Sequence, residues 1–198
     1  MLFDLEVYQL SWDIKLFGTK KDLTSIIAGK SEKILRNDAE RNTLVDWYPV
    51  KYDKLPINDA IFYCQRENVR WDSSIRAIYR IGICSLIFAL VLSILMLNII
   101  FDNSTLGFIT TFVFCISVVR WLFVQLNSIN EDIRRLDKLN ALFSDIEKDL
   151  DKILIIQSKI FTHRKECTMI PDWLYGITKN RQDKIMCVTA DIETESRR

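Results

Sequence analysis

The side chains best suited to holding a ligand lie together in one short segment. They are Gln65, Arg66, Asn68, Arg70, Trp71 and Asp72. Within two turns of a helix, arginine forks and amides could bind phosphate oxygens while the indole stacks on a base. The alternative is structural: Arg66 and Arg70 anchor at lipid headgroups, and Trp71 packs in a core. Asp72 would then pair with an arginine such as Arg164, and the sequence leaves both interpretations open.

A second group of polar residues lies inside two long apolar runs. Its members are Ser85, Ser93, Asn98, Thr110, Thr111, Ser117 and Arg120. One interpretation is helix packing, because small and hydroxyl side chains let membrane helices approach closely. The other is that several copies of the chain turn these residues toward a water-filled path, with Arg120 at its cytoplasmic mouth. A single hairpin encloses no water, so this second interpretation requires assembly.

Patterns that would indicate catalysis, metal binding or nucleic-acid binding are missing from the sequence. His163 is its one histidine, and no GxSxG, HExxH or Walker-type loop occurs. We interpret His163, beside Arg164, as a surface or interface side chain. The five cysteines form no CxxC pair, and the net charge of +1 is too small for a general binder of DNA or RNA. We therefore expect a non-enzymatic protein without a metal or cofactor.

Two apolar runs give the clearest architectural signal. Residues 81–101 contain no charged side chain, and as a helix they would be about 30 Å long, which matches the hydrocarbon thickness of a bilayer. Residues 106–126 form the second run, where Arg120 lies near enough to one end to reach the interface. Only residues 102–105 separate the runs. The sequence therefore predicts an antiparallel transmembrane hairpin.

The basic residues predict how this hairpin is oriented. Those next to it are Arg66, Arg70, Arg76 and Arg80 before the first run, and Arg134, Arg135 and Lys138 after the second. The tip at residues 102–105 has none. Because basic residues accumulate on the cytoplasmic side, we expect both termini in the cytoplasm and the tip outside.

Outside the hairpin, the sequence predicts long helices. Pro56 can open a helix from about Ile57 that continues into the first membrane run. After the second run, apolar residues recur three and four positions apart, with Gln157 as the one polar position. They are Leu136, Leu139, Phe143, Ile146, Leu150, Ile153 and Ile160. The pattern predicts one long stalk helix whose apolar stripe packs on its own domain or forms a seam between protomers.

The two ends of the chain are expected to complete the cytoplasmic part. Phe3, Leu5 and Val7 alternate with acids, which predicts a short strand. A helical stretch over about 22–41 and an aromatic turn at 47–49 follow. A last helix begins at Pro171 and fades into a polar tail. The expected fold is a mainly α membrane protein with a small α or α+β cytoplasmic domain built from both termini. Its expected parts are 1–56, the juxtamembrane helix 57–80, the hairpin 81–127 and the C-terminal helices 128–198.

Five segments carry a resemblance to a known family. They read FDLEVYQLSWD, DWYPVKYDKLP, CQRENVRWDSSIRAIYR directly before the hairpin, IQSKIFTHR and IPDWLYGITKNRQDKIM. In this order, and over nearly the whole chain, they resemble the SMODS-associating four-transmembrane effector family of bacteria. Within the last two segments, we expect a group of residues to serve cytoplasmic packing: Arg164, Pro171, Asp172, Trp173 and Tyr175.

The resemblance implies a function. Members of the family are regarded as pore-forming effectors of antiphage signalling, in which a nucleotidyltransferase makes a cyclic oligonucleotide and the effector damages the bacterial inner membrane. It implies a homo-oligomer in the lipid bilayer, a cyclic oligonucleotide as possible ligand, and arrest or death of the infected cell. The alternative is a non-lytic membrane sensor or adaptor that binds a partner protein through its stalk.

One departure from the family pattern concerns the membrane helices. The family has two of them before the segment that begins like FDLEVYQLSWD, whereas this sequence contains a single hairpin. We expect either a form that lacks the first hairpin, through truncation or a late start codon, or a two-helix variant.

Overall fold

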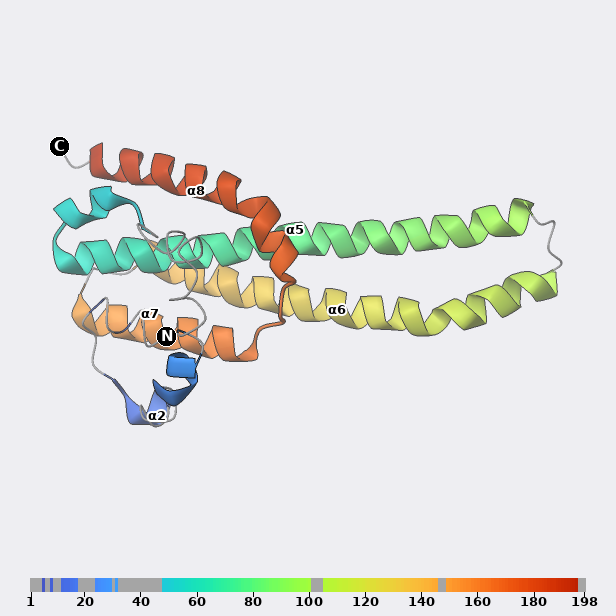
Figure 1. Ribbon diagram of the computed structural model, residues 1–198, viewed down its shortest axis with the longest axis horizontal. Coiled ribbons are helices and arrows are strands. Elements are labelled where there is room, and N and C mark those ends of the chain that lie inside the picture. The colour runs from blue at the N-terminus through green and yellow to red at the C-terminus, as the bar shows by residue number, and fades with distance from the viewer. Residues whose placement is uncertain are drawn as a thin grey trace.

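The computed structural model describes Leu5, Tyr8 and residues 12–17, 24–29, 31, 48–100, 105–145 and 149–195. Every element in this part is helical: α2 (Ile14–Phe17), the 3-10 helix η1 (Val50–Lys54), α5 (Ile57–Ile100), α6 (Thr105–Asp145), α7 (Leu150–Glu166) and α8 (Asp172–Glu195). Figure 1 shows α5 and α6 as a long hairpin with the other helices gathered at one end. The predicted mainly α architecture is confirmed.

Helices α5 and α6 run without a break from this end into the apolar runs. We call residues 81–100 and 105–126 the spans, and the described residues 5–80 and 127–195 the head. Helix α5 begins directly after Pro56 and contains no further proline, so the prediction of one helix from Ile57 into the first span is confirmed. Both helices are long and apolar enough to cross a membrane.

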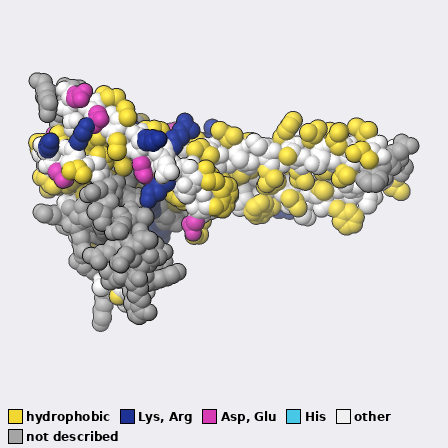
Figure 2. All heavy atoms as spheres, turned by 45° about the horizontal axis from the view of Figure 1, so that its top comes forward, with side chains coloured by type: hydrophobic (Ala, Val, Ile, Leu, Met, Phe, Trp, Pro, Cys, Tyr) yellow, Lys and Arg dark blue, Asp and Glu magenta, His cyan; other side chains and the backbone are white. Residues whose placement is uncertain are grey.

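The spans present their apolar side chains outward. Only 11% of the most apolar window of α5 and 6% of that of α6 are buried. Near the head, Ile83 and Leu122 of the two spans pack together with Ile129. Figure 2 shows apolar side chains along the rod of the hairpin and most of the charged ones on the head. This surface suits a hydrocarbon environment, because leaving so much apolar area in water is unfavourable.

The prediction of one helix through residues 136–160 is wrong, because the chain reverses between α6 and α7. The carboxylate of Asp149 accepts a hydrogen bond of 2.7 Å from the next backbone N–H and caps the start of α7. Helix α7 returns along α6, so that Leu142 and Leu154 line the same cavity. The apolar spacing continues through the turn since both helices bury one face in a common core. Ile146 lies outside the described residues.

The apolar stripe belongs to the protomer's own core. The buried positions of the stripe in that core are Leu136, Leu139, Phe143, Ile153 and Ile160. The same cluster contains Leu5 and Tyr8 from the start of the chain and Ala190 from its end. Among the described stripe positions, Leu150 is exposed. Burial within one chain favours the first of the two interpretations of the stripe over a seam between protomers.

The chain ends differ from expectation in two places. Helix α8 begins after Pro171 as predicted but continues to Glu195, because its polar end is held by ion pairs of Lys51 with Asp191 and of Arg66 with Glu193. Leu5 is helical, so the strand is wrong at that position. The rest of 3–7, most of 22–41, Trp47 and the tip at 102–104 lie outside the described residues. The division into four parts stays a prediction.

Candidate functional site

A buried ionic cluster lies where the head meets the spans. Arg76, 2% exposed, donates hydrogen bonds to Asp72 on its own helix (2.9 Å), to Asp132 on α6 (2.6 Å) and to the Thr168 carbonyl (3.0 Å). Asp132, 1% exposed, also accepts from the Thr168 backbone N–H at 2.9 Å. One guanidinium therefore ties α5, α6 and the connection between α7 and α8 together. We call Asp72, Arg76, Asp132, Arg135 and His163 the ionic junction.

His163 extends the junction to α7. Its Nε2 lies 2.8 Å from an oxygen of Asp72, and the side chain is only 4% exposed. The interpretation of His163 as a surface or interface residue is therefore wrong, because the side chain lies in the core, where its Nε2 contacts a carboxylate on a neighbouring helix. The pairing of Asp72 with Arg164 is also wrong, since the ionic partners of Asp72 are Arg76 and His163.

Arg135 extends the junction at its other end. Its guanidinium pairs with Asp132 and, at 3.1 Å, with Glu166 at the end of α7. The hydrogen-bonded chain therefore runs from His163 through Asp72, Arg76 and Asp132 to Arg135. A displacement of α7 would alter the contacts at both ends of this chain, because His163 and the Glu166 partner of Arg135 both lie on α7.

The charge state of Asp72 follows from its contacts in the junction. Burial opposes ionisation of Asp72, but the hydrogen bonds and charges of His163 and Arg76 outweigh it and keep the pKa of Asp72 below its ordinary value. A carboxyl whose pKa falls on folding stabilises the folded state above its unfolded pKa of about 3.9. This stabilisation is lost as the pH drops through the lowered value. Asp72 is therefore ionised at physiological pH.

Two of the six predicted ligand residues are amides bound within the head. Gln65 is fully buried and donates to Gln157 Oε1 at 2.7 Å and to the Ile153 carbonyl at 3.3 Å. Asn68 donates to the Tyr48 hydroxyl at 2.7 Å. Gln157, the polar position of the stripe, therefore finds its partner in the same chain. Both amides hold α5 to neighbouring segments.

The two predicted ligand arginines are held by acids. Arg66 pairs with Glu193 of α8, and its guanidinium carbon lies 4.8 Å from the centre of the Tyr63 ring. Arg70 lies 3.2 Å from Glu67 and 3.8 Å from Glu193. Burial raises the pKa of Glu67, and the nearby charges of Arg70 and Arg66 oppose that rise. These contacts supply a structural role for both arginines, on the side of the head that faces α8.

A small cavity beside the junction brings part of the predicted site together. It has a volume of about 230 Å³ and is lined by Asn68, Trp71 and Asp72, together with Arg164 and Tyr175 from the motif near the C-terminus. Trp71 also packs against the apolar cluster of Ile75, Ile170 and Leu174. Gln65, Arg66 and Arg70 do not line this cavity. The structure thus brings three of the six residues together around this cavity, while Arg70 and Trp71 line a second cavity beside α8.

The remaining motif residues mark the start of α8. Pro171 precedes the helix, and its carbonyl accepts from the Leu174 N–H at 3.0 Å. Asp172 is the first helical residue, where a negative charge favours the positive end of the helix dipole. Trp173 is exposed. The packing role expected for these residues stays a prediction.

Most of the polar side chains in the spans form hydrogen bonds within their own helix. Four of them donate to carbonyls of their own helix one turn back: Ser93 (2.7 Å), Asn98 (2.7 Å), Thr110 (2.9 Å) and Thr111 (3.0 Å). Ser85, Ser117 and Arg120 are exposed on the single hairpin. Self-satisfied hydroxyls can face lipid or a second helix at little cost. This geometry is compatible with packing, and a pore-lining role stays a prediction.

The fold and the junction define a class of protein, a mainly α membrane protein. Two helices suited to crossing a bilayer continue out of a charged head, and buried charged side chains hold these helices to the rest of the head. The description "SMODS-associating 4TM effector domain" matches residues 1–192, and the chain belongs to this family. The resemblance found in the sequence is confirmed. Comparison with curated proteins and with solved structures gave no match.

Proposed function

We propose that the protein is an effector of bacterial antiphage defence that permeabilises or disrupts the inner membrane when a cyclic nucleotide signal is made. The match of the effector family to residues 1–192 carries this proposal. The unbroken course of α5 and α6 supports it, because a helix continuous from head to span transmits a movement of the head into the bilayer. The outcome for the infected cell is arrest or death.

The action requires several copies of the chain. The spans of one copy expose large apolar side chains such as Ile99 and Phe114, and two helices leave no room for a water-filled path between them. In a homo-oligomer these apolar side chains contact lipid or neighbouring copies. The polar residues of the spans then line the path, with Arg120 at its cytoplasmic mouth.

The first prediction is loss of membrane potential. Inducing the full-length protein together with its signal-producing nucleotidyltransferase should depolarise the inner membrane, measured with a potential-sensitive dye, before viable counts fall. The matched control is a catalytically inactive nucleotidyltransferase at equal effector level, for which potential is retained. Normal growth and intact membranes in both cultures would instead favour a non-lytic sensor or adaptor.

The second prediction concerns orientation, with both termini in the cytoplasm. A cysteine placed at Asn103, in a background without the native thiols, should react with a membrane-impermeant maleimide in intact cells, because the tip carries no basic residue. Asp53→Cys, exposed on η1, is the control and should react only after permeabilisation. The reverse pattern of labelling would place the head outside and contradict a cytoplasmic trigger.

A further inference from the structure

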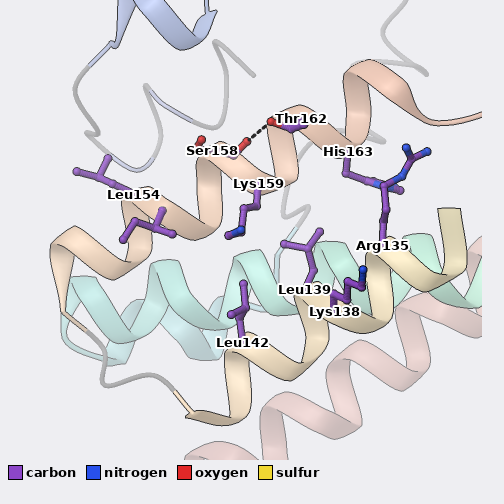
Figure 3. A pocket seen from close by; sticks show the side chains of 10 residues that line it. Arg135, Lys138, Leu139, Leu142, Leu154, Ser158, Lys159, Thr162 and His163 are labelled. Atoms are coloured by element: carbon purple, nitrogen blue, oxygen red, sulfur yellow. Dashed lines mark hydrogen bonds between the residues drawn. The ribbon is translucent and has the colours of Figure 1, made fainter. Parts of the chain in front are cut away.

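A large cavity in the head lies between α6 and α7. Its volume of about 700 Å³ falls within the range of small-molecule sites. Figure 3 shows Leu139 and Leu142 on α6 and Lys159 on α7 pointing toward one another across it. The floor is apolar, and the rim carries cations and hydroxyl groups. None of the six residues singled out in the sequence lines this cavity.

The charge around the cavity is of one sign. Arg135, Lys138 and Lys159 line it, and none of its described lining residues is an acid. Arg135 is paired to Asp132 and Glu166. Within the described part of the chain, Lys138 and Lys159 have no ion-pair partner. Two unneutralised ammonium groups on the rim of an apolar cavity favour an anion with an apolar body.

Two buried polar atoms at the end of the cavity have no hydrogen-bond partner among the described residues. They are Nδ1 of His163 and Nε of Arg135, both in residues that line the cavity. The His163 side chain is more than nine-tenths buried, and its other nitrogen is bound to Asp72. A buried polar group without a hydrogen bond is costly, so it favours a ligand that supplies the missing partner. An anionic oxygen would accept from Arg135 Nε and from His163 when its ring carries both protons.

We propose that the cavity between α6 and α7 binds a phosphodiester ligand, with Lys138, Lys159, Arg135 and His163 around the phosphate and the apolar floor under the rest of the molecule. The inference rests on the proposed function in so far as it makes this cavity the site of the trigger. The phosphodiester belongs either to a soluble cyclic oligonucleotide or to an anionic lipid headgroup. Both supply the same charged oxygens.

The position of the cavity explains how occupancy would reach the membrane. Arg135 and His163 are the two ends of the ionic junction, and both Asp132 and Asp72 bind Arg76. A phosphate that draws Arg135 and His163 toward the cavity weakens their hold on these acids. The positions of Asp72 and Asp132 then change around Arg76, which lies close to the first span. Ligand binding and movement of the spans are thereby coupled.

The test measures binding to the full-length chain in nanodiscs. Cyclic dinucleotides and trinucleotides are titrated by calorimetry into discs of neutral lipid, and retention of phosphatidylglycerol is measured in parallel by native mass spectrometry. The double variant Lys138→Gln/Lys159→Gln should weaken binding of the true ligand about tenfold or more, since each lysine makes a charge-assisted contact. The control Lys165→Gln/Lys184→Gln removes the same charge from exposed positions outside the cavity and should bind as the wild type does.

Each outcome decides the inference. If the double variant loses nucleotide binding but retains lipid as the wild type does, the ligand is a soluble nucleotide. If it loses the lipid but binds nucleotide unchanged, the ligand is a lipid headgroup. Failure of every probe to bind the folded wild type, or equal binding by the double variant and the wild type, overturns the inference. Depolarisation without binding here would leave the proposed function standing, whereas binding without depolarisation would reject that function and keep the site.

Discussion

Replacing Arg76 with alanine is expected to destabilise the head strongly. The substitution leaves Asp132, at 1% exposure, with the partly exposed Arg135 in place of two cations, and it removes one of the two ionic partners of Asp72. Breaking a buried ion pair from one side costs about 3–5 kcal/mol. Against a total stability of about 5–15 kcal/mol for a typical domain, this is a large share. The head should therefore unfold at a much lower urea concentration, while the spans stay in the membrane.

The measurement is urea unfolding of the full chain in detergent, followed by near-ultraviolet circular dichroism and by protease resistance of the head. The control is Arg80→Ala, which removes an exposed arginine one turn further along α5. Arg76→Met/Asp132→Leu should recover much of the stability, because apolar residues replace a buried pair at little cost. An unfolding midpoint of Arg76→Ala equal to that of the control would show that the junction contributes nothing.

The hairpin and α5 were predictable because their signals are local. A run of residues 81–101 without charge determines a membrane helix by itself, and Pro56 marks where α5 begins. The start of α8 after Pro171 is of the same kind. Each depends on a few neighbouring residues and little on the remainder of the chain. The family resemblance likewise rested on contiguous motifs.

The reversal between α6 and α7 was hidden by the pattern that the two helices share. Both bury one apolar face in the same core, so the three-and-four spacing passes through the turn unchanged. Asp149 could have signalled the start of α7, since an aspartate is a favoured helix cap. Its neighbours Lys148 and Asp151 resemble the solvated face of one long helix. Local sequence therefore favoured the wrong alternative.

The junction was missed because burial of a charge depends on distant partners. Asp72 and Arg76 are four residues apart, as are pairs on any solvated helix, and Asp132 and Arg135 are three apart. Nothing local tells that these two pairs face each other across α5 and α6. His163 finds its carboxylate 91 positions away. Only the folded chain distinguishes a buried pair from an exposed one.

The same limit applied to the predicted ligand residues. Gln65 and Arg66 looked available because their partners, Gln157 and Glu193, come from the far end of the chain. The lysines of the larger cavity lie on two helices that the sequence predicted as one, so the cavity between them had no place in that prediction. The second candidate site exists only because the chain turns between α6 and α7 and places the two helices side by side.

Replacing Gly82 with proline is expected to abolish membrane depolarisation without unfolding the head. Gly82 lies in α5 at the start of the first span, and a Cβ added there meets nothing within 4 Å outside its own helix. Proline removes one hydrogen bond of the helix and clashes with the carbonyl of Ile78, which costs about 3 kcal/mol and kinks the helix. The head keeps all its contacts. Depolarisation should therefore be abolished while urea unfolding of the head is unchanged.

The matched control is Gly82→Ala, which fills the same open space and keeps the helix straight. Alanine should stabilise α5 by about 0.5–1 kcal/mol and leave depolarisation at the wild-type rate or above it. Both variants must reach equal levels in the membrane fraction, because the comparison is of activity per inserted copy. If the proline variant depolarises cells as fast as the alanine variant, an unbroken α5 is not needed for the signal. The spans would then respond to something other than movement of the head along α5.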